Sequence, residues 1–85
     1  MKKIMANENK FYKTSDLPLA TFISLYYSIQ SIEKSLDSPK RYFLFEQNDE
    51  LNNLIVLFWS GKAVVDPQKY FNALRLVKAR LYSEN

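Results

Sequence analysis

The fold of this chain is decided by the stretch Arg41-Tyr42-Phe43-Leu44-Phe45-Glu46. Aromatic residues are enriched in strands, where successive side chains point to opposite faces of the sheet. The stretch therefore predicts a strand with Phe43 and Phe45 on one face and Tyr42 and Leu44 on the other. Both faces are apolar, which is typical of a central strand that is covered on both sides.

Two further strands are predicted upstream of this one. Residues 29–34 and 41–47 flank a cluster of turn-forming residues at positions 37–39, which predicts a β-hairpin. Residues 11–14 contain two aromatic residues and a β-branched one, so we expect a short strand there that leads into a helix. The chain thus supplies three strands for one small sheet.

Two stretches have apolar residues at i, i+3, i+4 and i+7, the spacing of an amphipathic helix, and a third stretch has a similar helical stripe. The stripe positions are Leu19, Phe22, Ile23 and Tyr26 in the first, Leu51, Leu54, Ile55 and Phe58 in the second, and Tyr70 or Phe71, Leu74, Val77 or Lys78, and Leu81 in the third. Residues that favour helix starts precede each stretch: Asp16 with Pro18, Asn48 with Asp49, and Asp66 with Pro67. Gly61 is expected to end the second helix.

The predicted order of elements is β-α-β-β-α-α, which assigns the chain to the α+β class. The simplest arrangement is a three-stranded sheet with the helices packed mainly on one face. Residues 1–9 are mostly polar or charged and lack an apolar period, so they predict a flexible tail. Residues 10–83 contain no repeat or linker, and we expect them to form one domain.

The composition excludes most kinds of enzyme active site. The chain has no His and no Cys, which removes the usual catalytic triads and the standard zinc ligands. A single glycine excludes the glycine-rich loops that bind nucleotides. Asp16, Asp49, Glu50 and Asp66 lie at predicted helix starts, where capping or the helix dipole explains them. We expect no enzymatic activity, no catalytic residue, no cofactor and no bound metal; a site built from carboxylates alone is the distant alternative.

The sequence also indicates the cellular location of the protein. The longest apolar run, residues 54–59, is far shorter than the roughly 20 residues that a membrane helix needs. Polar residues follow the lysines at positions 2 and 3, where a signal peptide would be apolar. The absence of cysteine fits a reducing compartment. We therefore expect a cytoplasmic protein without membrane contact.

A positively charged helix is the clearest functional signal. Residues 67–83 contain four cations and no acidic residue, in a chain of net charge +3. Such a helix can neutralise the phosphates of nucleic acid. The alternative is structural, because the dipole favours cations near a helix C-terminus and a charged face keeps a protein soluble. The candidate nucleic-acid contacts are Lys69, Arg75, Lys78 and Arg80, with Lys40 and Arg41 beside the aromatic strand.

Aromatic residues give a second candidate surface, for a protein partner or a second copy of the chain. If helices cover one face of the sheet, the other face of the aromatic strand could stack on bases or on another protein. Trp59 widens the apolar face of its helix beyond what one-sided packing needs, and Trp is enriched in interfaces. Burial in the core is the alternative in both cases. The candidate interface residues are Tyr42, Phe43, Phe45 and Trp59.

Several segments also carry a family resemblance. They are FYKTSDLPLA at residues 11–20, RYFLFE at 41–46 and FWSGK at 58–62, followed by Tyr70, Leu74 and Lys78. In these residues the chain resembles a bacterial and phage family, Domain of unknown function (DUF5659). The resemblance covers residues 11–82 and implies one domain, but no activity, cofactor or catalytic residue. Together with the charge pattern, it leads us to expect a small accessory or regulatory binding domain that is not an enzyme.

Overall fold

The computed structural model describes residues 10–83, and the predicted tail of residues 1–9 lies outside this range. Within the described residues the chain forms three strands and three helices. They are β1 (Phe11–Thr14), α2 (Leu17–Ser24), β2 (Ser31–Lys34), β3 (Arg41–Glu46), α3 (Asp49–Trp59) and α4 (Pro67–Ser83). The predicted α+β class and the order β-α-β-β-α-α are confirmed.

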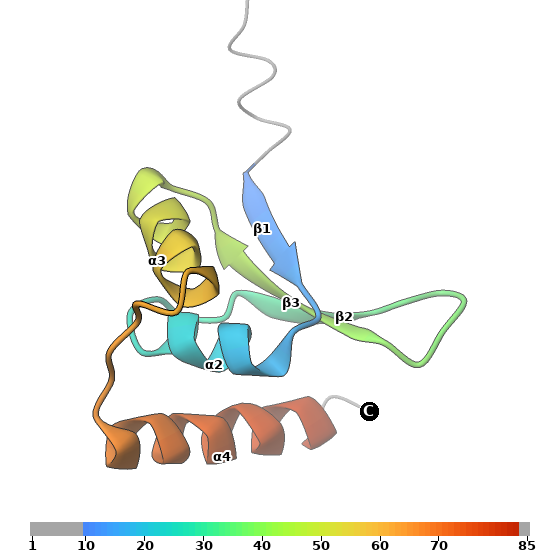
Figure 1. Ribbon diagram of the computed structural model, residues 1–85. Helices are drawn as coiled ribbons and strands as arrows, with labels where there is room; N and C mark the ends of the chain where they lie inside the picture. The colour runs from blue at the N-terminus through green and yellow to red at the C-terminus, as the bar shows by residue number, and fades with distance from the viewer. Residues whose placement is uncertain (1–9, 84–85) are drawn as a thin grey trace, which may run out of the picture.

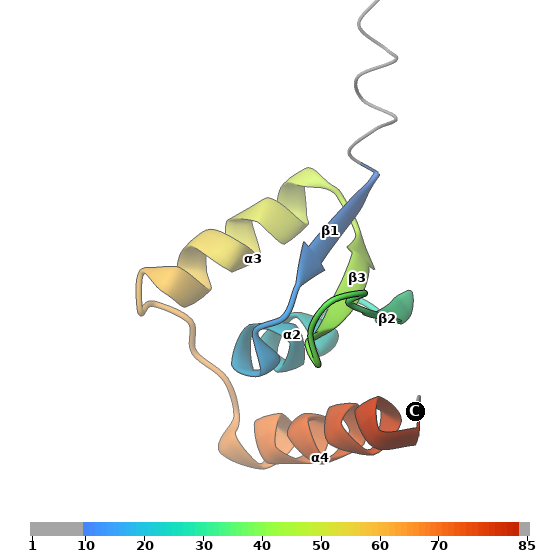
Figure 2. The same cartoon turned by 90° about the vertical axis from the view of Figure 1, so that its right-hand side faces the viewer.

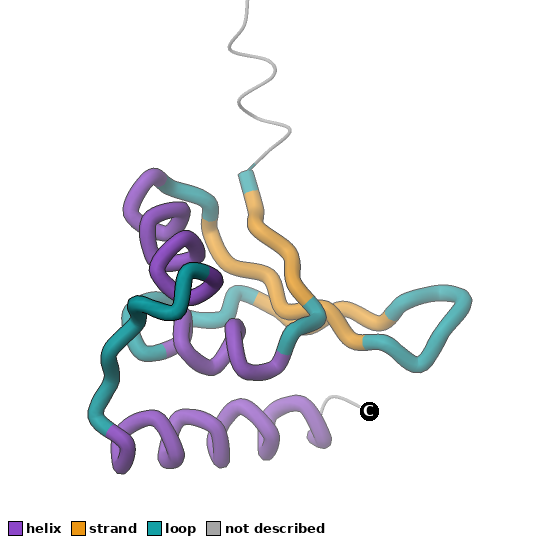
Figure 3. The backbone as a smooth tube through the Cα atoms, viewed as in Figure 1, coloured by secondary structure: helices purple, strands orange, loops and turns teal. Residues whose placement is uncertain are grey.

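β3 is the central strand of an antiparallel sheet with the order β1-β3-β2 (Figures 1 and 3). Phe45 of β3 lies opposite Tyr12 of β1, and Phe43 lies opposite Ile32 of β2. β2 and β3 form the predicted hairpin. The aromatic stretch is therefore the strand on which both edge strands assemble.

One face of this sheet forms the core. Phe43 and Phe45 point to this face, and their side chains are 2% and 0% exposed. α2 and α3 lie on the same side of the sheet (Figure 2), and residues of both helices belong to the buried cluster around the two phenylalanines. This burial removes Phe43 and Phe45 from the candidate interface, because a partner could reach them only by opening the core.

α2 is the most deeply buried helix. Residues 19–23 are buried without interruption, because the sheet, α3 and α4 surround this helix. Asp16 caps its N-terminus as predicted, since the carboxylate Oδ1 accepts the Leu19 N–H at 2.9 Å. The capping carboxylate is therefore explained by structure rather than by catalysis.

α2 ends earlier than its apolar spacing predicts. The spacing extends to Tyr26, but the helix ends at Ser24. The N–H groups of Tyr26 and Tyr27 both donate to the Ile23 carbonyl at 2.9 Å, which tightens the last turn. Tyr26 consequently lies in the turn that leads towards β2, and it is exposed.

α3 begins and ends where the sequence predicts. Asn48 caps it, with Oδ1 accepting the Leu51 N–H at 2.8 Å. At the other end Gly61 has a positive φ of 75°, and the Lys62 N–H donates to the Leu57 carbonyl at 3.0 Å. This is the hydrogen bond of a Schellman motif, in which glycine is the favoured residue.

α4 packs against α2 on the side away from the sheet (Figures 1 and 2). Asp66 caps it, with Oδ2 accepting the Lys69 N–H at 2.9 Å. The residues that face inward are Tyr70, Leu74, Val77 and Leu81, and the alternatives Phe71 and Lys78 are exposed. Because one narrow stripe holds α4 in place, most of the surface of this helix is available to solvent.

Candidate functional site

The six candidate cations lie on three parts of the molecule. Lys40 is exposed in the β2–β3 loop, Arg41 is the first residue of β3, and the other four lie on α4. The cations therefore do not form a single row along one element.

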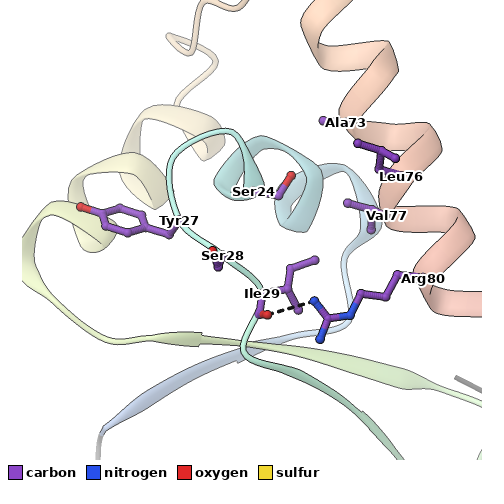
Figure 4. Close-up of a pocket in the computed structure, with 8 residues that line it drawn as sticks. All are labelled: Ser24, Tyr27, Ser28, Ile29, Ala73, Leu76, Val77 and Arg80. Carbon is purple, nitrogen blue, oxygen red and sulfur yellow. Dashed lines mark hydrogen bonds between the residues drawn. The ribbon is translucent and has the colours of Figure 1, made fainter.

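Two of the six cations make hydrogen bonds that support the fold. Arg80 is half-buried, and its Nη1 donates to the Ile29 carbonyl at 3.0 Å (Figure 4). Arg41 is also half-buried, and its Nη1 donates to the Pro39 carbonyl at 3.3 Å. The hydrogen bond of Arg80 links α4 to the α2–β2 connection, so this residue has a structural role, which was the alternative to a nucleic-acid contact.

The other cations of α4 lie on different sides of the helix. Lys69 borders a depression that is also lined by Tyr26 and Val65, next to the α3–α4 linker. Arg75 and Lys78 lie about one helical turn apart on the outward side, and both are exposed. Only this last pair shares an exposed helix face.

Two aromatic residues extend the face of Arg75 and Lys78. Phe71 and Tyr82 are 61% and 64% exposed. Positions 71, 75, 78 and 82 follow the spacing i, i+4, i+7 and i+11, which places them on one side of a helix over about 16 Å. We call these four residues the outer stripe of α4. Sequence reasoning missed its aromatic members, although counting in steps of four, three and four from residue 71 finds all four.

The second face of the sheet is crossed by charged side chains. Tyr42 and Leu44 on this face are half-buried. Lys13 of β1 places its Nζ 5.3 Å from the centroid of the Tyr42 ring and 3.7 Å from Oε1 of Glu33 on β2. This ion pair spans β3, so the aromatic strand does not present an open apolar surface.

Trp59 is the most accessible of the four candidate interface residues. It is 62% exposed, and its ring packs edge-on against Phe58 with the centroids 5.0 Å apart. Val56 is 65% exposed, and Leu57 is exposed as well. The second half of α3 is therefore apolar on its outward side as well as towards the core.

A depression of about 300 Å³ lies between α4 and the α2–β2 connection (Figure 4). Its lining residues are Ser24, Tyr27, Ser28, Ile29, Ala73, Leu76, Val77 and Arg80. Two of these side chains make hydrogen bonds within the fold: the Ser24 hydroxyl donates to the Thr21 carbonyl at 2.6 Å, and Arg80 donates to the Ile29 carbonyl. No group of acidic residues in the described part of the chain is placed to hold a metal ion.

The hydroxyl of Tyr27 points away from this depression towards α3 (Figure 4), where it donates to the Glu50 carboxylate. This hydrogen bond raises the pKa of Tyr27, and desolvation adds to the effect. Burial and the nearby charge of Asp16 raise the pKa of Tyr70 in the same direction. Both shifts favour the neutral phenol, and neither prepares a group for proton transfer near neutral pH.

The chain matches a family model over nearly its whole length. The model is Domain of unknown function (DUF5659), and the match covers residues 9–83. The chain belongs to this family. Comparisons with curated proteins and with solved structures give no significant match.

Most residues that carry the resemblance to DUF5659 have structural roles. Tyr70 and Leu74 face inward on α4, and the segment at residues 41–46 is the central strand. Lys78 differs, because it lies exposed on the outer stripe. No helix that the structure of this DUF5659 domain describes, from residue 10 to residue 83, could span a membrane.

Proposed function

We propose that this DUF5659 domain is a cytoplasmic, non-enzymatic accessory domain that contacts nucleic acid through the outer stripe of α4. One observation carries the proposal: Arg75 and Lys78 lie between Phe71 and Tyr82 on one exposed helix face. The proposed surface is narrower than the set of six cations that the sequence offers. Arg80 and Arg41 bond to backbone carbonyls, Lys69 lies on another side of α4, and Lys40 lies in the β2–β3 loop.

The charge on α4 supports a polyanionic ligand. No acidic residue occurs between Pro67 and Ser83, so no carboxylate within the helix competes for Arg75 and Lys78. Cations that neutralise phosphates release condensed counterions, and the affinity then falls as salt rises. With two phosphate contacts, we expect the logarithm of the affinity to fall against log salt with a slope of roughly −1.4 for a single strand or −1.8 for a duplex.

The aromatic residues at the two ends of the stripe favour single-stranded nucleic acid. Stacking of an unpaired base on an aromatic side chain contributes about 1–3 kcal/mol. Bases in a duplex are already stacked on each other and offer no free ring face. Phe71 and Tyr82 therefore make single strands the preferred ligand, and the cations hold the backbone between them.

The test is fluorescence anisotropy with a labelled single-stranded oligonucleotide and the matching duplex, at several salt concentrations. We expect tighter binding of the single strand. Changing Arg75→Gln together with Lys78→Gln should weaken binding and bring the salt slope close to zero. Changing Phe71→Ala and Tyr82→Ala should weaken binding with little change in that slope, since stacking does not release counterions.

The matched control is Lys34→Gln together with Lys69→Gln. It removes the same charge, but from β2 and from a different side of α4. We expect this variant to bind nearly as well as the unmodified protein. Equal losses in the two double variants would show that net charge alone attracts the ligand, and no binding at about 50 mM salt would refute the contact altogether.

A further inference from the structure

We infer that the outward face of α3 binds a second copy of this chain, with the two helices antiparallel about a two-fold axis. This association is separate from the proposed nucleic-acid contact, which uses α4. It concerns the surface around Trp59.

The surface of α3 has a polar end and an apolar end. Its first half presents exposed Asp49 and Asn52, whereas its second half presents Val56 and Trp59, each more than 60% exposed. These four positions follow the spacing i, i+3, i+7 and i+10, which places them on one side of the helix. We call them the α3 stripe.

The charges at the two ends of α3 make this surface complementary to itself. Asp49 lies in the first turn, and Lys62 follows the C-terminus and is exposed. With the axis level with residues 55 and 56, Asp49 of one copy lies beside the C-terminal end of α3 in the other copy, where the exposed Lys62 follows Gly61. A two-fold interface makes this contact twice. The antiparallel arrangement also sets the positive end of each helix dipole beside the negative end of the other.

The same arrangement covers the exposed apolar residues. Val56 of each copy lies next to the axis, and Trp59 lies level with Asn52 of the second copy. A parallel pair would instead bring like charges together at both ends. Since α3 is only about 16 Å long, the contact area is small, and we expect weak association with a dissociation constant in the micromolar range or above.

The first test uses Trp59 as its own reporter, because it is the only Trp of the chain. Its fluorescence emission should shift to shorter wavelength between about 1 μM and 1 mM protein, while sedimentation velocity shows a monomer becoming a dimer. Changing Val56→Asp should abolish both effects, because the charge would be buried at the axis. Trp59→Ala should raise the dissociation constant at least about tenfold. A monomer over the whole concentration range would overturn the inference.

The second test shows whether the partner is a second copy of the chain and whether the two helices are antiparallel. Asp49→Lys and Lys62→Asp should each weaken self-association, because each places like charges together twice. An equimolar mixture of these two variants should form a heterodimer, since both of its end contacts then join opposite charges. Lys34→Asp on β2 is the matched control for Lys62→Asp, and should dimerise like the unmodified protein. Failure of the mixture to associate, or an equal loss in the control, would contradict the antiparallel arrangement.

Discussion

α2 and α4 pack against each other, but α2 is mostly buried and uncharged, whereas α4 is mostly exposed and positively charged. α2 has eight residues, none of them charged, and buries positions 19–23 completely. α4 has 17 residues, carries four cations, and has Val77 as its buried residue. A helix that is buried over most of its length serves to stabilise the fold. A longer helix held by one stripe keeps most of its surface for contact with a ligand.

The largest expected effect on stability comes from replacing a leucine by alanine, a substitution that can be made in either helix. Leu19 of α2 is 0% exposed and Leu76 of α4 is 71% exposed. Leu19→Ala should lower the free energy of unfolding by about 2–5 kcal/mol, because it leaves a cavity in the core. Leu76→Ala should change it by less than about 0.5 kcal/mol. Urea denaturation measures both values, and similar losses would show that α4 belongs to the core as fully as α2 does.

Removing the carboxylates that cap α2 and α4 should have an effect of intermediate size on stability. Asp16→Ala removes the cap of the enclosed helix and should lower the free energy of unfolding by about 1 kcal/mol. Asp66→Ala removes an exposed cap, and its loss should be confined to faster hydrogen exchange in the first turn of α4. If Asp66→Ala lowered the free energy of global unfolding more than Asp16→Ala does, α4 would contribute more to global stability than α2, which would contradict the comparison.

The sequence predicted features that depend on local chemistry. The carboxylates and amide at Asp16, Asn48 and Asp66 cap helices, and Gly61 ends α3, because a cap or a positive φ needs a particular residue type at one position. The alternation of residues 41–46 likewise identified the central strand. These features do not depend on where the rest of the chain lies.

Features that depend on distant contacts could not be predicted. The hydrogen bond from Arg80 to Ile29 joins residues 51 positions apart, and it gives this arginine a structural role. The ion pair between Lys13 and Glu33 spans β3 only because the strand order is β1-β3-β2. The sequence also left open whether Val77 or Lys78 faces inward on α4, and the burial of Val77 against the rest of the fold decides between them.

The smallest expected effect is a change in stability at alkaline pH. The hydrogen bond to Glu50 raises the pKa of folded Tyr27 above its unfolded value of about 10. A raised pKa stabilises the fold below the unfolded pKa, and this contribution is lost as the pH rises through the folded pKa. The difference in stability between the unmodified protein and Tyr27→Phe should therefore be constant up to about pH 10 and shrink above it.

Thermal unfolding of both proteins between neutral pH and about pH 11 measures this difference. Tyr70, whose pKa is also raised, is present in both proteins, so its titration cancels in the comparison. A difference that stays constant over the whole range would show that the bond between Tyr27 and Glu50 does not contribute to stability.

The most direct test of the contrast between α2 and α4 is to map binding by NMR. ¹⁵N-labelled protein is titrated with a short single-stranded oligonucleotide, and the amide shifts are followed for every residue. We expect the largest changes within residues 71–82 of α4, while the amide shifts of residues 19–23 of α2 and 43–45 of β3 stay unchanged. Changes centred on the β2–β3 loop or on the sheet, or no changes at all, would contradict the assignment of nucleic-acid binding to the outer stripe.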